Sequence, residues 1–143
     1  MTTNADITIF NAVYDSTTRN EKFIPTVIRN VSLFVAETAN TNDGVWTEQS
    51  SYKIRVPYLD ATIEGGREYV PQERYTGDSS TWTLRHGDLI ALGVYASDTA
   101  SLTRDAAIEW ASGAGVKMIS ISDYADNTIR GSDATKHWRI GGQ

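Results

Sequence analysis

Apolar and polar residues alternate along several short stretches of the chain, and this two-residue period is typical of β-strands. The clearest stretch carries Tyr52, Ile54 and Val56, which alternate with two basic residues. Because successive side chains of an extended chain point to opposite faces, the pattern predicts a strand with one apolar and one polar face. We expect this strand to end at Pro57, which has no backbone N–H to donate to a neighbouring strand.

Further strands are predicted where apolar, β-branched and aromatic residues are bounded by turn residues. These segments are residues 6–13, 26–35, 51–56, 89–94 and 116–121, and a last strand that begins near Thr135. The long second strand has an irregularity near Asn30. Turns are predicted at residues 85–88, 123–127 and 131–132, where Gly, Asp, Asn and Ser gather. Residues 61–80 are the least regular part of the chain. Residues 37–49 are expected to form a long hairpin loop on the surface, with an Asn-Asp-Gly turn signal inside it.

The last seven residues carry an informative pattern. Trp138 and Ile140 lie two positions apart, so an extended backbone places them on one face, with His137 and Arg139 on the other. Chain ends fray unless the rest of the protein holds them. A large aromatic and a branched aliphatic residue at this place therefore predict that the C-terminal segment is docked in a sheet.

One helix is predicted in the second half of the chain. Ser101 or Thr103 can cap its first turn, because a hydroxyl oxygen there accepts a backbone N–H. Leu102, Ala106 and Trp110 follow at the helical spacing of four residues, with two more alanines beside them. Gly113 can end the helix.

These elements together predict a mainly β fold. A chain of 143 residues is expected to form one domain, which we place at residues 1–143. Six or seven short strands separated by turns indicate a small β-barrel or a sandwich, with long loops and one short helix. A barrel has the advantage that closure hides the strand edges.

The composition limits which cellular compartment and which kinds of partner we expect for the protein. The chain has no cysteine, which excludes disulfides and thiolate metal sites. No apolar run approaches the ~18 residues of a membrane span, and the N-terminus lacks the features of a secretory signal. We therefore expect a cytosolic protein without a membrane partner. Its 18 acidic and 13 basic residues give a net charge of −5, which argues against specific binding of nucleic acid.

No catalytic signature is found in the sequence, so we expect a protein that is not an enzyme and needs no cofactor or metal. The two histidines, His86 and His137, are far apart and belong to no spaced metal-binding motif. Glu64, Glu68 and Glu73 are the best-placed acids for a glycosidase pair. Surface carboxylates are, however, the ordinary interpretation in so acidic a chain.

The aromatic residues allow a binding interpretation. Tyr69, Tyr75 and Trp82 are the candidates for a platform on which a sugar stacks. Aromatic residues also fill cores and subunit interfaces, so packing is the simpler role. A carbohydrate-binding or host-recognition module therefore stays an alternative from another functional class.

Three stretches together resemble a known family. The first stretch is residues 4–11, followed by Tyr14-Asp15 and Thr18-Arg19. The second is Tyr69-Val70-Pro71 and Trp82-Thr83-Leu84, with Gly87-Asp88 and Gly93. The third is residues 120–123, with Asp126-Asn127, residues 130–132 and residues 137–142. This pattern is similar to small tailed-phage and prophage proteins called minor capsid or head–tail connector proteins. The likeness spans nearly the whole chain, although segments 35–50 and 96–115 contribute nothing to it.

The resemblance implies a structural role in the phage neck. The chain would be a head-closure (stopper) subunit, assembled in the host cytoplasm and located in the virion. It would form a ring with copies of itself, typically of six subunits, in contact with the portal, the adaptor and the tail proteins. Genomic DNA would pass through this ring without specific binding.

Within such a ring, particular residues have expected roles. The acidic residues Glu37, Asp43 and Glu48 would line the channel, where negative charge lets DNA slide. Packing and interface contacts are expected of Tyr69, Tyr75, Trp82, His137, Trp138 and Arg139. A tail-terminator or adaptor ring and a capsid decoration protein remain alternatives within the same structural class.

Overall fold

The computed structural model describes residues 3–15, 19–42, 45–77, 80–96, 101–129, 131–132 and 135–143, and for residues 15 and 36–50 it describes the backbone alone. The elements in chain order are β1 (Ala5–Asp15), β2 (Asn20–Asn42), β3 (Val45–Pro57), β4 (Thr62–Ile63), the 3-10 helix η1 (Glu64–Gly66), β5 (Glu68–Tyr69), the 3-10 helix η2 (Gln72–Arg74), β6 (Thr81–Trp82), β7 (Leu89–Ala91), α1 (Arg104–Ala114), β8 (Met118–Asn127) and β9 (His137–Gly142).

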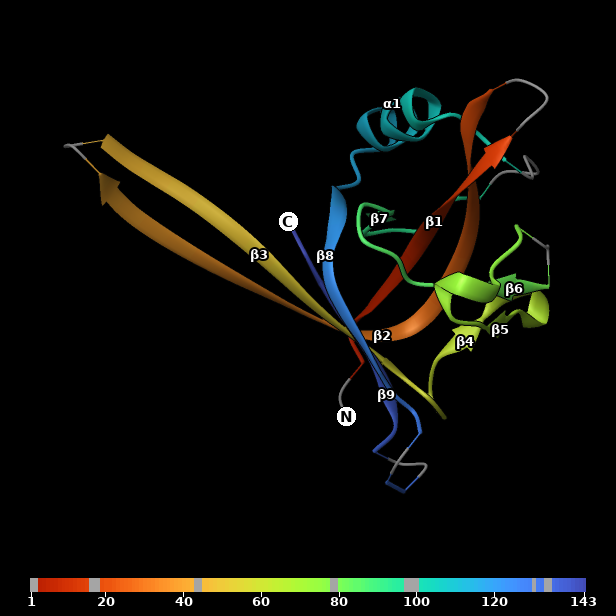
Figure 1. Ribbon diagram of the computed structural model, residues 1–143. Helices are drawn as coiled ribbons and strands as arrows, with labels where there is room; N and C mark the ends of the chain where they lie inside the picture. The colour runs from red at the N-terminus through yellow and green to blue at the C-terminus, as the bar shows by residue number, and fades with distance from the viewer. Residues whose placement is uncertain are drawn as a thin grey trace.

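Six strands of the described chain close into a β-barrel (Figure 1), in the order β1, β7, β8, β9, β3 and β2. The circle is completed by β2, which pairs with β1, and the short β4 adds to β2 outside it. All of these pairings are antiparallel. The expectation of a mainly β, barrel-like fold with one short helix is confirmed.

The long strand β2 changes partner halfway along its length. It pairs with β1 up to Val31 and with β3 from Ser32 onward. The change occurs next to Asn30, which has a φ of 65°, a left-handed conformation that few residues other than glycine adopt. The Asp6 carboxylate accepts the Asn30 backbone N–H at 3.0 Å and holds this irregularity. The irregularity predicted near Asn30 is confirmed.

Beyond the barrel, β2 and β3 continue as a two-stranded ribbon, which we call the arm (residues 36–51). Its pairs run from Ala36 opposite Ser51 to Asn42 opposite Val45. The pairing of β1 with β2 has ended at Val31, and β9 accompanies β3 only from Tyr52. The arm therefore projects from the barrel, at the left of Figure 1. The predicted long hairpin loop at residues 37–49 is not a loop over residues 37–42 and 45–49, because the antiparallel strand register of the barrel continues into the arm there.

The barrel interior is filled by side chains that alternate along its strands. Ile54 and Val56 are fully buried while Lys53 and Arg55 are exposed, as the sequence pattern predicts. The main core consists of Ile7, Ile9, Ile28, Val31, Ile54, Val56, Trp82, Leu84, Ile90, Ile119, Ile121, Trp138 and Ile140. All six strands of the barrel contribute side chains to this core, so the core joins the two ends of the chain.

The helix α1 begins where the sequence predicts and ends slightly later. Thr103 is the N-cap, and its Oγ1 accepts the backbone N–H of Ala106 at 3.2 Å. The helix ends at Ala114 rather than at Gly113, because Gly115 takes the left-handed conformation of a C-cap, with a φ of 70°. No helix within the described residues is long and apolar enough to cross a membrane.

The buried face of α1 differs from the prediction. Ala107 and Ala111 are buried, whereas Ala106 is exposed. Leu102 precedes the helix and bridges Phe23 of β2 instead. The small alanines let the helix approach a second core cluster at one end of the barrel. That cluster consists of Phe10, Ala12, Phe23, Leu89, Ala91, Leu102 and Ala107.

The C-terminal segment is docked as predicted, but its surroundings differ. β9 starts at His137, two residues after the predicted start, and lies between β3 and β8. The prediction of a turn at residues 123–127 is wrong, since β8 runs on to Asn127, which faces His137. The register shift between Ile121 and Asp123 places a bulge there. Pairing with β9 thus overrides the local turn preference of Asp and Asn.

The described part of the irregular segment 61–80, which is residues 61–77 and 80, consists of short elements beside the barrel. It contains β4, η1, β5 and η2, and β5 pairs in parallel with β6, placing Tyr69 opposite Trp82. Arg29 of β2 anchors η1, because its Nε lies 2.8 Å from Glu64 Oε1. This layer lies on the right of Figure 1, away from the arm.

Candidate functional site

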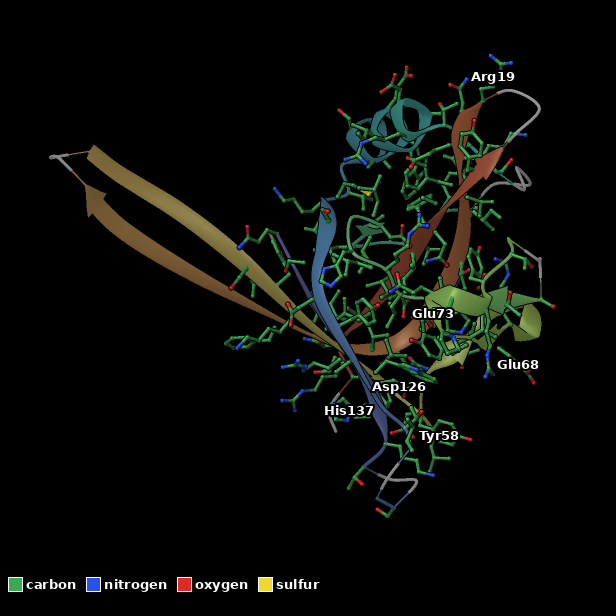
Figure 2. The ribbon with its side chains drawn as sticks, in the orientation of Figure 1. Arg19, Tyr58, Glu68, Glu73, Asp126 and His137 are labelled. Carbon is green, nitrogen blue, oxygen red and sulfur yellow. The ribbon has the colours of Figure 1, made fainter. Side chains whose placement is uncertain are left out.

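The two histidines lie in different places and have local partners. The His86 ring packs against Tyr124, with 5.4 Å between ring centroids. His137, labelled in Figure 2, has its Nδ1 3.0 Å from the Thr135 carbonyl oxygen and its Nε2 3.3 Å from Asn127 Nδ2. Among the residues the structure describes, no group of three or more His, Cys, Asp or Glu is placed to hold a metal ion.

The three acids considered for glycosidase chemistry behave as surface carboxylates. Glu64 is engaged by Arg29 in the ion pair at 2.8 Å. Glu68 and Glu73 are exposed on β5 and η2, where Figure 2 labels them. All three are therefore placed as ordinary exposed carboxylates, and not as an enclosed pair of acids of the kind that flanks a glycosidic bond.

The candidate stacking aromatics form a packed cluster. Tyr69, Trp82 and Trp138 meet one another with ring centroids 5.1 to 5.6 Å apart, and Tyr58 lies 6.1 Å from Trp138. Trp82 is fully buried, so its ring face is not open to a sugar, and Tyr75 is half-buried. Edge-on and tilted contacts between rings are the arrangement that aromatic cores favour.

A cleft of 630 Å³ opens beside this cluster. It is lined by Tyr58, Ile63, Arg67, Glu68, Tyr69, Pro71, Asp126, Thr128 and Trp138. Burial, helped by the negative charge of Asp126, raises the pKa of Tyr69 to about 12. Its phenol therefore stays protonated at neutral pH and is a hydrogen-bonding group rather than a nucleophile. Arg67, which lines the cleft, donates a hydrogen bond from Nη1 to Thr26 Oγ1 of β2 at 2.8 Å.

The outer face of the barrel next to the arm carries a group of positive charges. Lys53 and Arg55 are exposed on β3, and Arg55 stands directly opposite Arg139 of β9. Phe34 of β2 stands opposite Lys53 and is 61% exposed. We call this surface, consisting of Phe34, Lys53, Arg55 and Arg139, the basic ledge. Arg139 is here exposed rather than packed.

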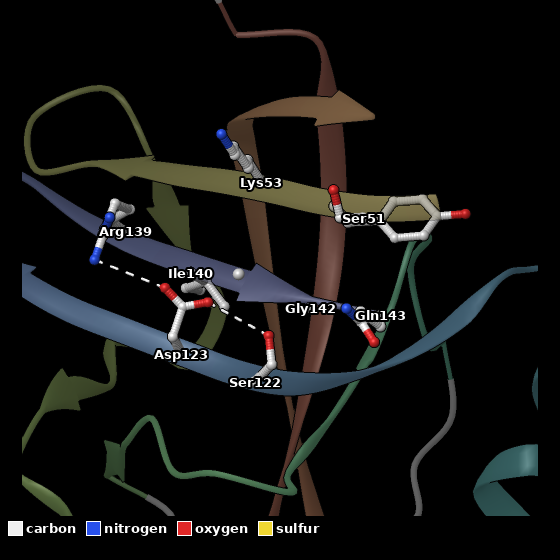
Figure 3. Close-up of a pocket in the computed structure, with 10 residues that line it drawn as sticks. Ser51, Lys53, Ser122, Asp123, Arg139, Ile140, Gly142 and Gln143 are labelled. Carbon is white, nitrogen blue, oxygen red and sulfur yellow. Dashed lines mark hydrogen bonds and ion pairs between the residues drawn. The ribbon is translucent and has the colours of Figure 1, made fainter. Parts of the chain in front are cut away.

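A pocket of 200 Å³ continues the ledge toward the C-terminus (Figure 3). Lys53 and Arg139 line it together with Asp123, whose Oδ2 lies 3.7 Å from Arg139 Nη2. The Asp123 carboxylate occupies the space that a side chain at Gly141 would take. Gly141 and Gly142 therefore let β9 fit between its neighbours, and this is the structural reason for the Gly-Gly pair near the end of the chain.

The residues predicted to line a channel lie outside the described side chains. Glu37 and Glu48 belong to the arm, whose backbone alone is described, and Asp43 falls between β2 and β3 in a position the structure does not describe. Their channel-lining role stays a prediction.

Comparison with known proteins gives a family but no activity. The whole chain, residues 1–143, matches the family of unknown function DUF6751. The chain belongs to this family. No curated protein and no solved structure matches this DUF6751 chain. Its function has therefore to be argued from its own geometry.

The basic ledge of this DUF6751 member is a feature that the sequence does not reveal. Lys53 and Arg55 are recognisable as outward residues of one strand, but Arg139 lies far away in the chain. Only the register between β3 and β9 places the two arginines side by side. No spacing within a single segment carries that information.

Proposed function

We propose that this protein is a structural subunit of the neck of a tailed phage or prophage, most specifically a head-closure (stopper) subunit. In this role it forms a ring, of six subunits in the typical case, between the portal and adaptor on one side and the tail on the other. Genomic DNA passes through the ring without specific contacts. The three-part sequence resemblance supports this role.

The observation that carries the proposal is the arm. Among the strand pairings of the described residues, no third strand joins Ala36–Asn42 or residues 45–50, since β1 and β9 have ended before the arm begins. An isolated two-stranded hairpin is at best marginally stable in water, and open strand edges favour pairing with another chain. A barrel that holds such an arm away from its own surface is suited to contacts with neighbouring subunits.

A ring also needs two different surfaces on each subunit. A head-to-tail interface closes into a ring when each subunit presents one surface to the next subunit and another to the previous one. The arm on one side and the closed barrel on the other supply two such surfaces. The barrel gives a rigid body, and the arm gives the reach that an assembled neck requires.

A test replaces the arm without touching the barrel. Residues 37–50 are replaced by Asn-Gly, which joins Ala36 and Ser51 by the two-residue turn that hairpins favour. The variant should keep the thermal unfolding transition of the parent, because the described backbone of the removed residues pairs across the arm and not with the barrel strands. In the phage that encodes the protein, it should fail to complement a disrupted gene.

Electron cryomicroscopy of the assembled particle provides the direct measurement. We expect density for this subunit between the portal and the tail, in the copy number of a closed ring. Full complementation by the folded arm-replacement variant would contradict the proposal, as would particles in which the neck contains no density for this chain.

A further inference from the structure

The basic ledge has a charge arrangement that works against the stability of the isolated barrel. Arg55 and Arg139 are directly opposite on adjacent strands, and like charges in such pairs are destabilising. Lys53 lies two residues along the same face. Asp123 contacts Arg139 at 3.7 Å, and within the described part of the chain Lys53 and Arg55 make no ion pair. In a chain of net charge −5, this concentration of cations indicates an anionic partner.

The ledge also presents an apolar group next to its charges. Phe34 is 61% exposed and borders a groove of 260 Å³ that Ser32, Lys53 and Arg55 complete. Lys53 lines both this groove and the pocket of Figure 3, so the two hollows form one continuous surface. A partner that fits this surface combines negative charge with apolar side chains.

The arm of a second copy has this composition. Residues 36–51 contain Glu37, Asp43 and Glu48 and no Lys or Arg, and they contain apolar residues such as Val45 and Trp46. The arm of the same subunit cannot cover its own ledge, since it continues the strands that carry Phe34 and Lys53 and leaves the barrel (Figure 1). The complementary segment must therefore come from a neighbour.

We propose that the acidic arm of one subunit lies on the basic ledge of the next subunit. This inference rests on the proposed ring and specifies its interface. The contact is head-to-tail, because arm and ledge are different surfaces, and each subunit gives one arm and receives another. The neighbour's acids offset the repulsion between Arg55 and Arg139, and its apolar residues cover Phe34. The arm acids then have a protein partner rather than a place on the channel wall.

Charge reversal on each side provides the test. The ledge variant carries Lys53→Glu, Arg55→Glu and Arg139→Glu, and the arm variant carries Glu37→Lys, Asp43→Lys and Glu48→Lys. Each variant alone should lose self-association by about tenfold or more, because every arm–ledge contact becomes a repulsion of like charges. An equimolar mixture should recover it, since each ledge then meets an arm of opposite charge in a strictly alternating ring.

The matched control reverses three exposed cations elsewhere on the protein. The variant with Arg74→Glu, Arg104→Glu and Lys117→Glu has the same change in net charge as the ledge variant. It should associate like the parent. Self-association is measured by sedimentation equilibrium and native mass spectrometry at high protein concentration. Incorporation into purified particles is measured in parallel, so that a protein that assembles only on its neighbours is tested as well.

The outcomes separate this inference from the proposed function. Ledge variants that associate and enter particles like the parent would overturn the inference, even if the subunit lies in the neck. A mixture that fails to recover would overturn it too. Duplex DNA binding that the ledge variant alone loses, without recovery in the mixture, would assign the ledge to nucleic acid instead. Recovery by the mixture in a protein absent from the neck would support the interface and contradict the neck role.

Discussion

The buried carboxylate of Asp88 accepts a hydrogen bond from the side-chain amide of buried Asn11 at 2.9 Å. The same amide donates to the Thr83 carbonyl oxygen at 2.7 Å, and Asn11 Oδ1 accepts the Thr83 N–H at 3.3 Å. Asp88 Oδ1 accepts from the Ala12 N–H and from Arg85 Nη2, both at 3.3 Å. These bonds join β1 to the segment before β7 where no strand ladder connects them.

The first prediction concerns the loss of this network. Asn11→Ala removes the bonds to Asp88 and Thr83 and leaves buried polar groups without partners, which costs about 1–3 kcal/mol for each such group. We expect the free energy of unfolding, measured by urea titration, to fall by at least that amount. The matched control is Asn20→Ala at the exposed start of β2, which should stay within about 0.5 kcal/mol of the parent. Equal effects of the two substitutions would contradict the structural role of Asn11.

The second prediction concerns the pH dependence of stability. Burial raises the pKa of Asp88 above its ordinary value of 3.8, although the hydrogen bond from Asn11 and the charge of Arg85 oppose this rise. The folded state therefore holds a proton more tightly than the unfolded state. Stability from this group is complete below pH 3.8 and is lost as pH rises through the raised pKa.

The substitution Asp88→Asn isolates that dependence. The difference in unfolding free energy between parent and variant, measured in urea from acidic to neutral pH, should shift against the parent as pH rises above 3.8 and then level off. Taking the difference cancels the contributions of the other carboxylates. A difference that shifts in favour of the parent over this range would show that the pKa of Asp88 is lowered in the folded state.

The third prediction concerns Tyr69 in the aromatic cleft. Burial first, and then the charge of Asp126, raises its pKa from 10.0 to about 12. Nuclear magnetic resonance of ¹³C-labelled tyrosine should show one ring that titrates near that value and disappears in Tyr69→Phe. Asp126→Asn should lower the pKa by part of the shift. Because the folded-state pKa is raised, stability should fall as pH rises from 10 to 12, and this fall should be smaller in Tyr69→Phe.

Local patterns predict those parts of the fold that depend on one strand at a time. The alternation of Ile54 and Val56 with exposed residues and the docking of Trp138 and Ile140 both depend on one buried face, which a two-residue period reveals. Pairing partners are not encoded in that way. The segment 123–127 has the residues of a turn, yet it is a strand because β9 pairs with it along its whole length.

The sequence predicts less of the candidate site, the basic ledge, than of the fold. The basic ledge depends on the register that places Arg55 opposite Arg139. A shift of that register by one residue would turn Arg139 to the other face of the sheet. The arm escaped prediction for a related reason. Its Asn-Asp-Gly turn signal includes two residues that the structure does not describe. The length of the paired strands on either side of that signal follows from the continuation of β2 and β3 beyond the barrel.

The fourth prediction distinguishes the two glycines of β9. A Cβ at Gly142 would lie 2.8 Å from the Ser120 carbonyl oxygen and 2.9 Å from Ile119 Cδ1. The three atoms nearest to a Cβ at Gly141 all belong to the Asp123 carboxylate, the end of an exposed side chain that is held by Arg139 at 3.7 Å and can shift. Gly142→Ala should therefore cost about 1–3 kcal/mol by overpacking against the backbone. Gly141→Ala should cost less, because Asp123 can move away from it.

A double-mutant cycle checks this explanation. In an Asp123→Ala background, the cost of Gly141→Ala should vanish, since the overlapping carboxylate is absent. The cost of Gly142→Ala should remain unchanged in that background. If Asp123→Ala relieved both substitutions or neither, the carboxylate would not be what excludes a side chain at Gly141. Urea unfolding of the four glycine variants and their parents gives the required free energies.

The last prediction concerns the C-terminal strand. Deletion of residues 137–143 removes β9, which hydrogen-bonds to β3 on one side and β8 on the other. It also removes Trp138 and Ile140 from the core, and the loss of one large core side chain alone costs about 3–5 kcal/mol. The total stability of a domain is typically about 5–15 kcal/mol, so the truncated chain should be unfolded. Far-ultraviolet circular dichroism and amide chemical-shift dispersion measure this loss of structure directly.

The control deletes Gln143 alone, which breaks its two backbone bonds with Ser120 and should leave the barrel folded. Native dispersion in the longer truncation would mean that β3 and β8 can close the barrel without β9.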